Sequence, residues 1–144
     1  MYPIKSKTIM HEDILSDIVR LLRDNLPLIA VILFGSRARG DWVPWSDYDL
    51  LIIADFQEKY LDRIGKILNI LGKIKIPIEP HPYTLEEAIS MLRNGNPIIV
   101  DAIEEGKILY TTRRLKRLYE EYHKLKKNGL ARTHTTIIIP KKRT

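Results

Sequence analysis

The chain has 144 residues, of which 44% are hydrophobic and 29% charged, and its formal net charge is +6 at pH 7. This length predicts one compact domain with its own core, and the absence of cysteine excludes disulfides and thiolate metal sites. No apolar run approaches the roughly 18 residues of a membrane span, and the first five residues lack a signal-peptide core, so we expect a cytoplasmic protein with no membrane partner.

The first third of the chain predicts a helix, a buried strand and a tight turn. Residues 12–25 carry apolar side chains at helical spacing. Leu28–Phe34 is a continuous run rich in Ile and Val, which is typical of a buried strand. Gly35 ends this run, and Ser36 can open a short helical turn through Arg39.

The Gly35-Ser36 turn has the residues of a phosphate site. Glycine lets the backbone approach a phosphate closely, and free N–H groups at the start of a helical turn favour anions. The Ser36 hydroxyl can add a hydrogen bond, and Arg37 or Arg39 can neutralise phosphate charge. The alternative is an ordinary strand-to-helix turn with Ser36 as its N-cap.

Asp47 and Asp49 lead into a second buried-strand run, residues 50–54. Residues two apart in a strand point to the same face, about 7 Å apart along the axis. Two carboxylates at this spacing can hold divalent metal ions together with phosphate oxygens. The alternative is that Asp47 only ends a loop, but an aspartate pair beside a buried strand is costly without a counter-charge.

Glu79 is the candidate for a third acid, at the end of a short strand expected over residues 74–79. It can act as a metal ligand or as a base, and the prolines around it indicate an edge strand or a strand that stops here. Its alternative is a solvated side chain in a proline-rich loop. Asp55, at the strand exit, and Asp41, in the loop and expected to pair with Arg37 or Arg39, are the competing acids. His81 is close in sequence to Glu79 and can touch the site, but we favour its interpretation as a surface histidine.

The rest of the chain predicts helices around a small sheet. Thr84 and Glu87 form a capping-box pattern, and Pro97 suits the first turn of another helix. Helices are expected over residues 56–71, 84–92, 97–105 and 112–128, and a short strand over 107–111. We therefore predict an α/β (α+β) fold in which a small mixed β-sheet is flanked by helices.

Charge divides the chain near residue 111. Residues 1–111 hold 13 Lys and Arg against 16 Asp and Glu, whereas residues 112–144 hold 11 against 2. We take 1–111 as the main domain and 112–144 as a basic helix and tail, either part of the same domain or an extension that docks a partner. For the helix, we favour an apolar stripe that covers the core beneath a solvated basic face over docking to an acidic protein or RNA. Residues 135–139 can add a strand to a partner's sheet or stay mobile.

Two tryptophans lie between the two halves of the motif. Trp42 and Trp45 can stack on a base or a partner surface, or they can pack the loop down.

The segment from Gly35-Ser36 to Asp47-Tyr48-Asp49, with ten residues between Ser36 and Asp47, resembles the motif of the DNA polymerase beta-like nucleotidyltransferase superfamily. The runs Gly-Ser-Arg-Ala-Arg-Gly and Ser-Asp-Tyr-Asp-Leu are especially similar to the antitoxin-type minimal nucleotidyltransferases. Residues 77–87 resemble the third-acid strand and following helix of that family, and the resemblance covers residues 10–111.

The resemblance implies the polymerase beta-like fold and a two-metal reaction with ATP as the donor. Asp47, Asp49 and Glu79 would be the catalytic residues and would hold two Mg²⁺ ions. The nucleotide-binding residues would be Gly35, Ser36, Arg37 and Arg39. An acceptor hydroxyl, deprotonated with the help of Glu79, would attack the α-phosphate and release pyrophosphate.

The resemblance also implies a partner, because minimal nucleotidyltransferases often accompany a small helical HEPN toxin and neutralise it by adenylylation or by binding. The chain would then transfer AMP to a hydroxyl of that toxin, within a hetero-oligomer or a homo-oligomer. The alternatives are a nucleotidyltransferase that modifies a small molecule such as an antibiotic, and a non-catalytic module that binds protein or RNA. A nucleic acid is a possible but not a favoured partner.

Overall fold

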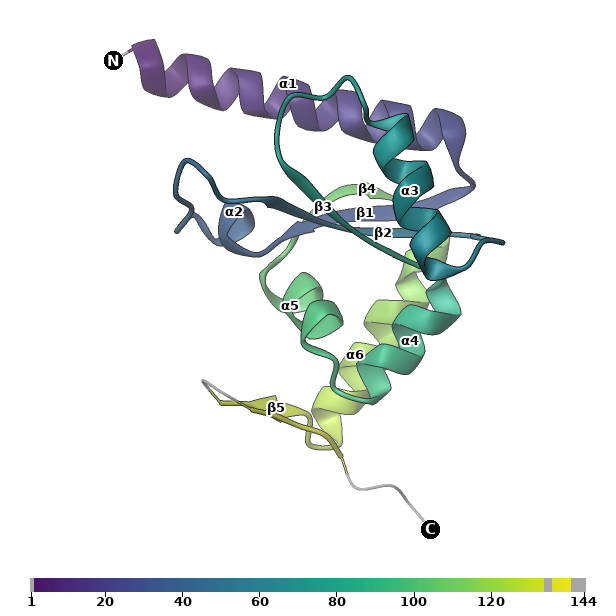
Figure 1. Cartoon of the computed structure of the whole chain (residues 1–144). Helices are drawn as coiled ribbons and strands as arrows, with labels where there is room; N and C mark the ends of the chain where they lie inside the picture. Colours follow the sequence, from purple (N-terminus) through teal and green to yellow (C-terminus); the bar gives the residue numbers. More distant parts are fainter. Residues whose placement is uncertain (1, 134–135, 141–144) are drawn as a thin grey trace.

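The computed structural model describes the backbone of residues 2–133 and 136–140, and the side chains of these residues from residue 13 onward. A four-stranded sheet with the strand order β3-β2-β1-β4 lies at its centre (Figure 1). β1 (Leu28–Phe34) pairs antiparallel with β2 (Tyr48–Ala54) and with β4 (Lys107–Thr111), whereas β3 (Ile78–Tyr83) runs parallel to β2. The expected mixed sheet is therefore confirmed.

Helices cover both faces of this sheet, as Figure 1 shows. α1 (Tyr2–Asn25) and α3 (Tyr60–Ile70) pack on one face, where Ile18, Leu22 and Ile67 meet alternate residues of the two central strands. α4 (Leu85–Arg93), α5 (Pro97–Glu105) and α6 (Lys116–Lys127) pack on the other face. β1 and β2 are apolar on both sides because each face lies under helices.

The sequence patterns predicted most of the helices and strands correctly. The expected bounds of β1, α5 and β4 agree with the structure, and the capping box of α4 forms between Thr84 and Glu87. α1 extends the expected helix toward the amino end, to Tyr2, and α3 begins at Tyr60 rather than at residue 56.

The expected strand over residues 74–79 is wrong in its bounds. β3 begins at Ile78, so Glu79 is the second residue of a strand and not the last residue of one. Pro80 and Pro82 lie inside this strand, which is possible because β3 is at the edge of the sheet and its outer side needs no N–H donors.

The basic carboxyl-terminal helix covers the core, as the favoured interpretation held. Leu115, in a 3₁₀ turn (η1, Arg113–Leu115), and Leu118 are buried in the same core cluster as α4 and α5. Two of the arginines of this segment pair with acids of the main domain, Arg114 with Asp55 and Arg117 with Glu86. The division of the chain at residue 111 stays a prediction.

A short hairpin follows α6. β5 (Ala131–Arg132) pairs antiparallel with β6 (Ile137–Ile138), so these two residues form a strand, and the expectation that this apolar segment joins a partner's sheet or stays mobile stays a prediction. Their strand partner is within the same chain. Residues 134–135 and 141–144 lie outside the described residues. Among the described residues, no helix has the length and apolar character needed to cross a membrane.

Candidate active site

Two of the three predicted acids, Asp49 and Glu79, lie side by side on the neighbouring strands β2 and β3. Phe34 pairs with Asp49 across β1 and β2, and Asp49 pairs with Glu79 across β2 and β3. Residues paired across neighbouring strands have their side chains on the same face. The sheet therefore places the Asp49 and Glu79 carboxyl groups side by side, next to the end of β1 from which Gly35 continues.

Gly35 is the residue that lets the turn after β1 close over Asp49. Its φ angle is +75°, and a Cβ atom at this position would overlap the Asp49 carboxylate. Its carbonyl accepts hydrogen bonds from the N–H groups of Ala38 and Arg39, which start the four-residue helix α2 (Ser36–Arg39). Gly35 occupies the N-cap position, so the alternative in which Ser36 is the N-cap is wrong.

Asp49 and Glu79 form a cluster with a residue that the sequence interpretation left on the surface. One ligand atom from each of Asp49, Glu79 and His81 lies within 4.8 Å of the other two. The His81 Nε2 atom is 3.2 Å from Oδ1 of Asp49, and only 12% of the His81 side chain is exposed. The interpretation of His81 as a surface histidine is therefore wrong.

The position of His81 follows from the bounds of β3. Because this strand includes residues 79 to 81, strand alternation puts the side chains of Glu79 and His81 on the same face. The His81 ring packs on Phe34, with 5.0 Å between the ring centroids. The Glu-x-His spacing was a usable signal, but the prolines on either side of His81 favoured a loop.

The carboxyl groups of Asp49 and Glu79 lie close enough to affect each other's protonation. Partial desolvation, and then the hydrogen bond and charge of Asp49, raises the pKa of the Glu79 carboxyl above its ordinary value, and the charge of Asp47 acts in the same direction. Asp47 itself is exposed, just before β2 begins, and is not a member of the three-residue cluster. Two carboxylates and an imidazole at this spacing fit a divalent cation, whose charge would relieve the repulsion.

The two predicted phosphate-binding arginines differ in their surroundings. The Arg37 side chain is buried between the rings of Trp42 and Tyr48, with its guanidinium carbon 4.4 Å from each ring centroid. It donates hydrogen bonds to the carbonyl oxygens of Ser46 (3.2 Å) and Pro44 (3.4 Å). Arg37 thus holds down the loop between the motif halves, and its role in phosphate binding stays a prediction.

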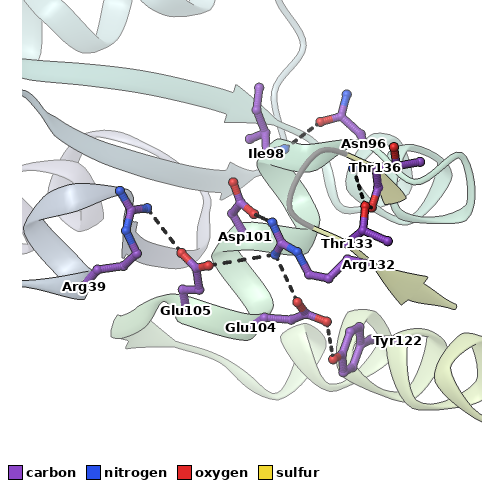
Figure 2. Close-up of polar contacts among 10 residues, drawn as sticks. All are labelled: Arg39, Asn96, Ile98, Asp101, Glu104, Glu105, Tyr122, Arg132, Thr133 and Thr136. Atoms are coloured by element: carbon purple, nitrogen blue, oxygen red, sulfur yellow. Dashed lines mark hydrogen bonds and ion pairs between the residues drawn. The ribbon is translucent and has the colours of Figure 1, made fainter. Parts of the chain in front are cut away.

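Arg39 is more accessible, and it pairs with two acids. Its Nε atom is 3.4 Å from Asp41, which confirms the expected pairing in the loop. Its Nη1 atom donates to Glu105 at 3.2 Å, an interaction drawn in Figure 2. Of the competing acids, Asp41 is thus engaged by Arg39, and Asp55 pairs with Arg114 at 2.6 Å.

The loop between the motif halves ends in a defined turn. The Ser46 N–H donates to the Val43 carbonyl, and the Val43 N–H donates to the Ser46 hydroxyl, both at 2.9 Å. Pro44 occupies the second position of this turn, as is common. Trp42 packs on Arg37, as expected if the tryptophans pack the loop down, whereas 78% of Trp45 is exposed, and stacking of Trp45 on a base or a partner surface stays a prediction.

Comparison with known proteins places this site in a family. A family model described as a nucleotidyltransferase domain matches residues 15–128, which include the glycine turn and all three predicted acids. The chain belongs to the nucleotidyltransferase domain family. The match confirms the family that the resemblance of the Gly-Ser and Asp-x-Asp segments and of residues 77–87 implies.

Curated relatives match over the same part of the chain. A candidate protein adenylyltransferase of Methanocaldococcus jannaschii is 36% identical over 86 residues, which are 58% of this chain and 58% of that protein. The bifunctional uridylyltransferase/uridylyl-removing enzyme of Pseudomonas entomophila is 32% identical over 82 residues, which are 56% of this chain and 9% of that enzyme. The chain thus spans less than two thirds of the length of either relative.

A solved structure shares the fold. A chain from the complex between a tri-AMPylated HEPN toxin of Shewanella oneidensis and its MNT antitoxin aligns with a TM-score of 0.50 and 21% identity. The alignment covers 77% of this chain and 79% of that chain. This likeness confirms the polymerase beta-like nucleotidyltransferase fold that the sequence resemblance implied.

Proposed function

We propose that the protein transfers AMP from ATP to a hydroxyl group of a partner protein, and that a HEPN-type toxin is this partner. The observation that carries the proposal is the contact of the Gly35 turn with Asp49, which puts a phosphate-sized turn next to the paired carboxyl groups. The adenylyltransferase relative supports AMP as the transferred group. The AMPylated toxin complex supports the acceptor.

The proposed reaction assigns a separate task to each part of the site. The N–H groups at the start of α2 and the Ser36 hydroxyl bind the triphosphate, and Arg39 neutralises part of its charge. The acceptor oxygen forms a bond to the α-phosphorus while the bond to the β-phosphate oxygen breaks, and pyrophosphate leaves. Glu79 takes the hydroxyl proton.

Divalent metal is part of this proposal. Asp47, Asp49 and Glu79 would hold two Mg²⁺ ions, which when bound neutralise the charge that develops on the phosphate oxygens. The fold sets the positions of these acids. The pairing of β2 with β3 fixes Asp49 and Glu79, and the loop that Arg37 binds at Ser46 leads directly into Asp47. A cytoplasmic location accords with an ATP-dependent reaction and belongs to the same proposal.

The test is transfer of label from ATP labelled at the α-phosphate. The purified chain is incubated with Mg²⁺ and a HEPN-type protein encoded beside it, and label is expected on that protein. Asp49→Asn should reduce the rate at least about 100-fold, because it removes a charge from the centre of the site. Asp55→Asn is the matched control, since Asp55 pairs with Arg114 outside the site, and it should retain the activity.

Parallel reactions separate the alternatives. Labelled UTP tests uridylyl transfer, which the Pseudomonas relative makes the main competing donor reaction. Label on small hydroxyl compounds but not on the HEPN-type protein would replace the proposed acceptor. A protein that binds the HEPN-type partner, with no label transferred from either nucleotide and no effect of Asp49→Asn, would be a non-catalytic binding module, and the proposal would fail.

A further inference from the structure

The cluster of Asp49, Glu79 and His81 has a composition that differs from the all-oxygen set of Asp47, Asp49 and Glu79. His81 contributes the nitrogen atom Nε2, at 3.2 Å from Oδ1 of Asp49. The ligand atoms that define the cluster all lie within 4.8 Å of one another, whereas Asp47 is outside it. Two donors bonded to one ion at about 2.1 Å are at most about 4.2 Å apart, so side-chain shifts of a few tenths of an ångström would let all three donors contact one ion.

The surroundings hold these three donors in place. Glu79 and His81 project from the same face of β3, and Asp49 lies opposite Glu79 on β2. The Phe34 ring, with its centroid 5.0 Å from that of His81 and the two planes at 57°, limits the orientations of the imidazole. The side chains of His81 and Asp49 are only 12% and 23% exposed, whereas Glu79 is exposed, so an ion at this position would be shielded on the side of His81 and Asp49 and open to solvent at Glu79.

We propose that His81 is a metal ligand, and that Asp49, Glu79 and His81 form a mixed nitrogen–oxygen position that binds a first-row transition-metal ion such as Mn²⁺ or Co²⁺ more tightly than Mg²⁺. Mg²⁺ favours oxygen ligands and water, whereas imidazole suits transition-metal ions, whose affinity for a given site rises from Mn²⁺ to Co²⁺. Asp47 and Asp49 would hold the other metal ion through oxygen ligands alone.

This inference rests on the proposed function in placing metal at the site, but it is tested without nucleotide or acceptor. The untagged full chain is loaded with Mn²⁺ and measured by pulsed electron paramagnetic resonance. A ¹⁴N coupling to the bound Mn²⁺ is expected, and it should change to a ¹⁵N coupling in protein labelled with ¹⁵N-histidine. This measurement needs no variant, so a failure of a variant to fold leaves the test intact.

A pair of variants identifies the histidine. His81→Gln should remove the nitrogen coupling and weaken Co²⁺ binding in calorimetry at least about tenfold, while Mg²⁺ binding changes by less than about twofold. His123→Gln is the matched control, because His123 is exposed on α6 and packs edge-on against Tyr122. It should leave the coupling and both affinities unchanged.

Two results would overturn this proposal, and a third would separate it from the proposed function. Mn²⁺ bound without nitrogen coupling would overturn the proposal and leave His81 as a hydrogen-bond partner that positions Asp49. Equal losses of Co²⁺ and Mg²⁺ affinity in His81→Gln would do the same. A nitrogen-coupled Mn²⁺ site in a protein that transfers no nucleotide would uphold the metal position while the proposed function fails.

Discussion

Gly35 and Asp49 are in such close contact that any side chain at residue 35 would overlap the Asp49 carboxylate. This contact joins the two halves of the motif, which are separated by the loop over residues 40–47. The backbone conformation adds a second requirement, because the φ angle of Gly35 is +75° and disfavours residues with a Cβ atom. The contact with Asp49 and the positive φ angle therefore each require a glycine at residue 35.

Gly35→Ala is expected to weaken metal binding and nucleotidyl transfer at least about tenfold, because the new methyl group displaces Asp49 from the cluster. Gly40→Ala is the matched control: Gly40 also has a positive φ, +95°, but a Cβ there meets nothing within 4 Å. Both variants should lose about 1–2 kcal/mol of unfolding free energy from backbone strain. Urea unfolding and calorimetry measure the two effects, and equal metal affinity in both variants would contradict the prediction.

Arg37→Lys is expected to destabilise the protein by about 1–2 kcal/mol, because a lysine cannot both stack between Trp42 and Tyr48 and donate to the two loop carbonyl groups. Arg39→Lys, at a more exposed ion pair, should change stability by less than about 0.5 kcal/mol. Urea unfolding of the two variants checks this. If Arg37→Lys weakens ATP binding and leaves the unfolding midpoint unchanged, Arg37 is a phosphate ligand and not a support for the loop.

The sequence was sufficient where the signals are local. The run Leu28–Phe34, the capping box at Thr84 and the proline at residue 97 each predict an element from a few neighbouring residues, and the structure agrees. The sequence named Glu79 as a candidate third acid but did not predict that its strand pairs with the strand of Asp49, because strand pairing depends on residues far apart in the chain.

The wrong predictions also concern features that depend on residues far apart in the chain. The bounds of β3 depend on its position at the sheet edge, which alone makes Pro80 and Pro82 acceptable in a strand, and His81 was misplaced as a consequence. The burial of Arg37 depends on carbonyl groups seven and nine residues further along, whose positions the loop sets only after folding. Neither arrangement has a local signature in the residue pattern.

Glu87→Gln is expected to reduce the unfolding free energy by about 1 kcal/mol at pH 7 and by less at acidic pH. Glu87 forms two hydrogen bonds with the buried Arg63, at 2.6 and 3.2 Å, and these hold its pKa below the ordinary value of 4.5. A lowered folded pKa stabilises the protein above about pH 4.5, and this contribution is lost as the pH falls through the folded value. The glutamine carbonyl can keep the capping-box hydrogen bond with the Thr84 N–H, so the variant removes the charge together with the hydrogen bond that Oε2 accepts from Arg63.

Urea unfolding at pH 7 and at about pH 3.5 measures this effect. Glu86→Gln is the control on the same helix turn, since the Arg117–Glu86 pair is exposed on both sides and should contribute little. A difference between the parent and Glu87→Gln that stays constant over this pH range would show that the Glu87 charge is not the cause.

Arg132→Gln is expected to release the β5–β6 hairpin from the rest of the protein. Arg132 pairs with Asp101 at 2.8 Å and Glu104 at 3.1 Å, and Glu105, which also binds Arg39, is 3.9 Å away (Figure 2). Without the guanidinium, three carboxylates of α5 face one another with less compensating charge.

Amide hydrogen exchange measures the release. Exchange at residues 131–132 and 137–138 should become several-fold faster in Arg132→Gln, and about 1 M salt should speed it in the parent by screening the same charges. Arg113→Gln, which removes an exposed arginine outside the hairpin, should leave exchange there unchanged. The hairpin also packs Ile137 and Ile139 close to Gly95, so slow exchange that persists in Arg132→Gln would show that this apolar contact holds the hairpin without the ion pairs.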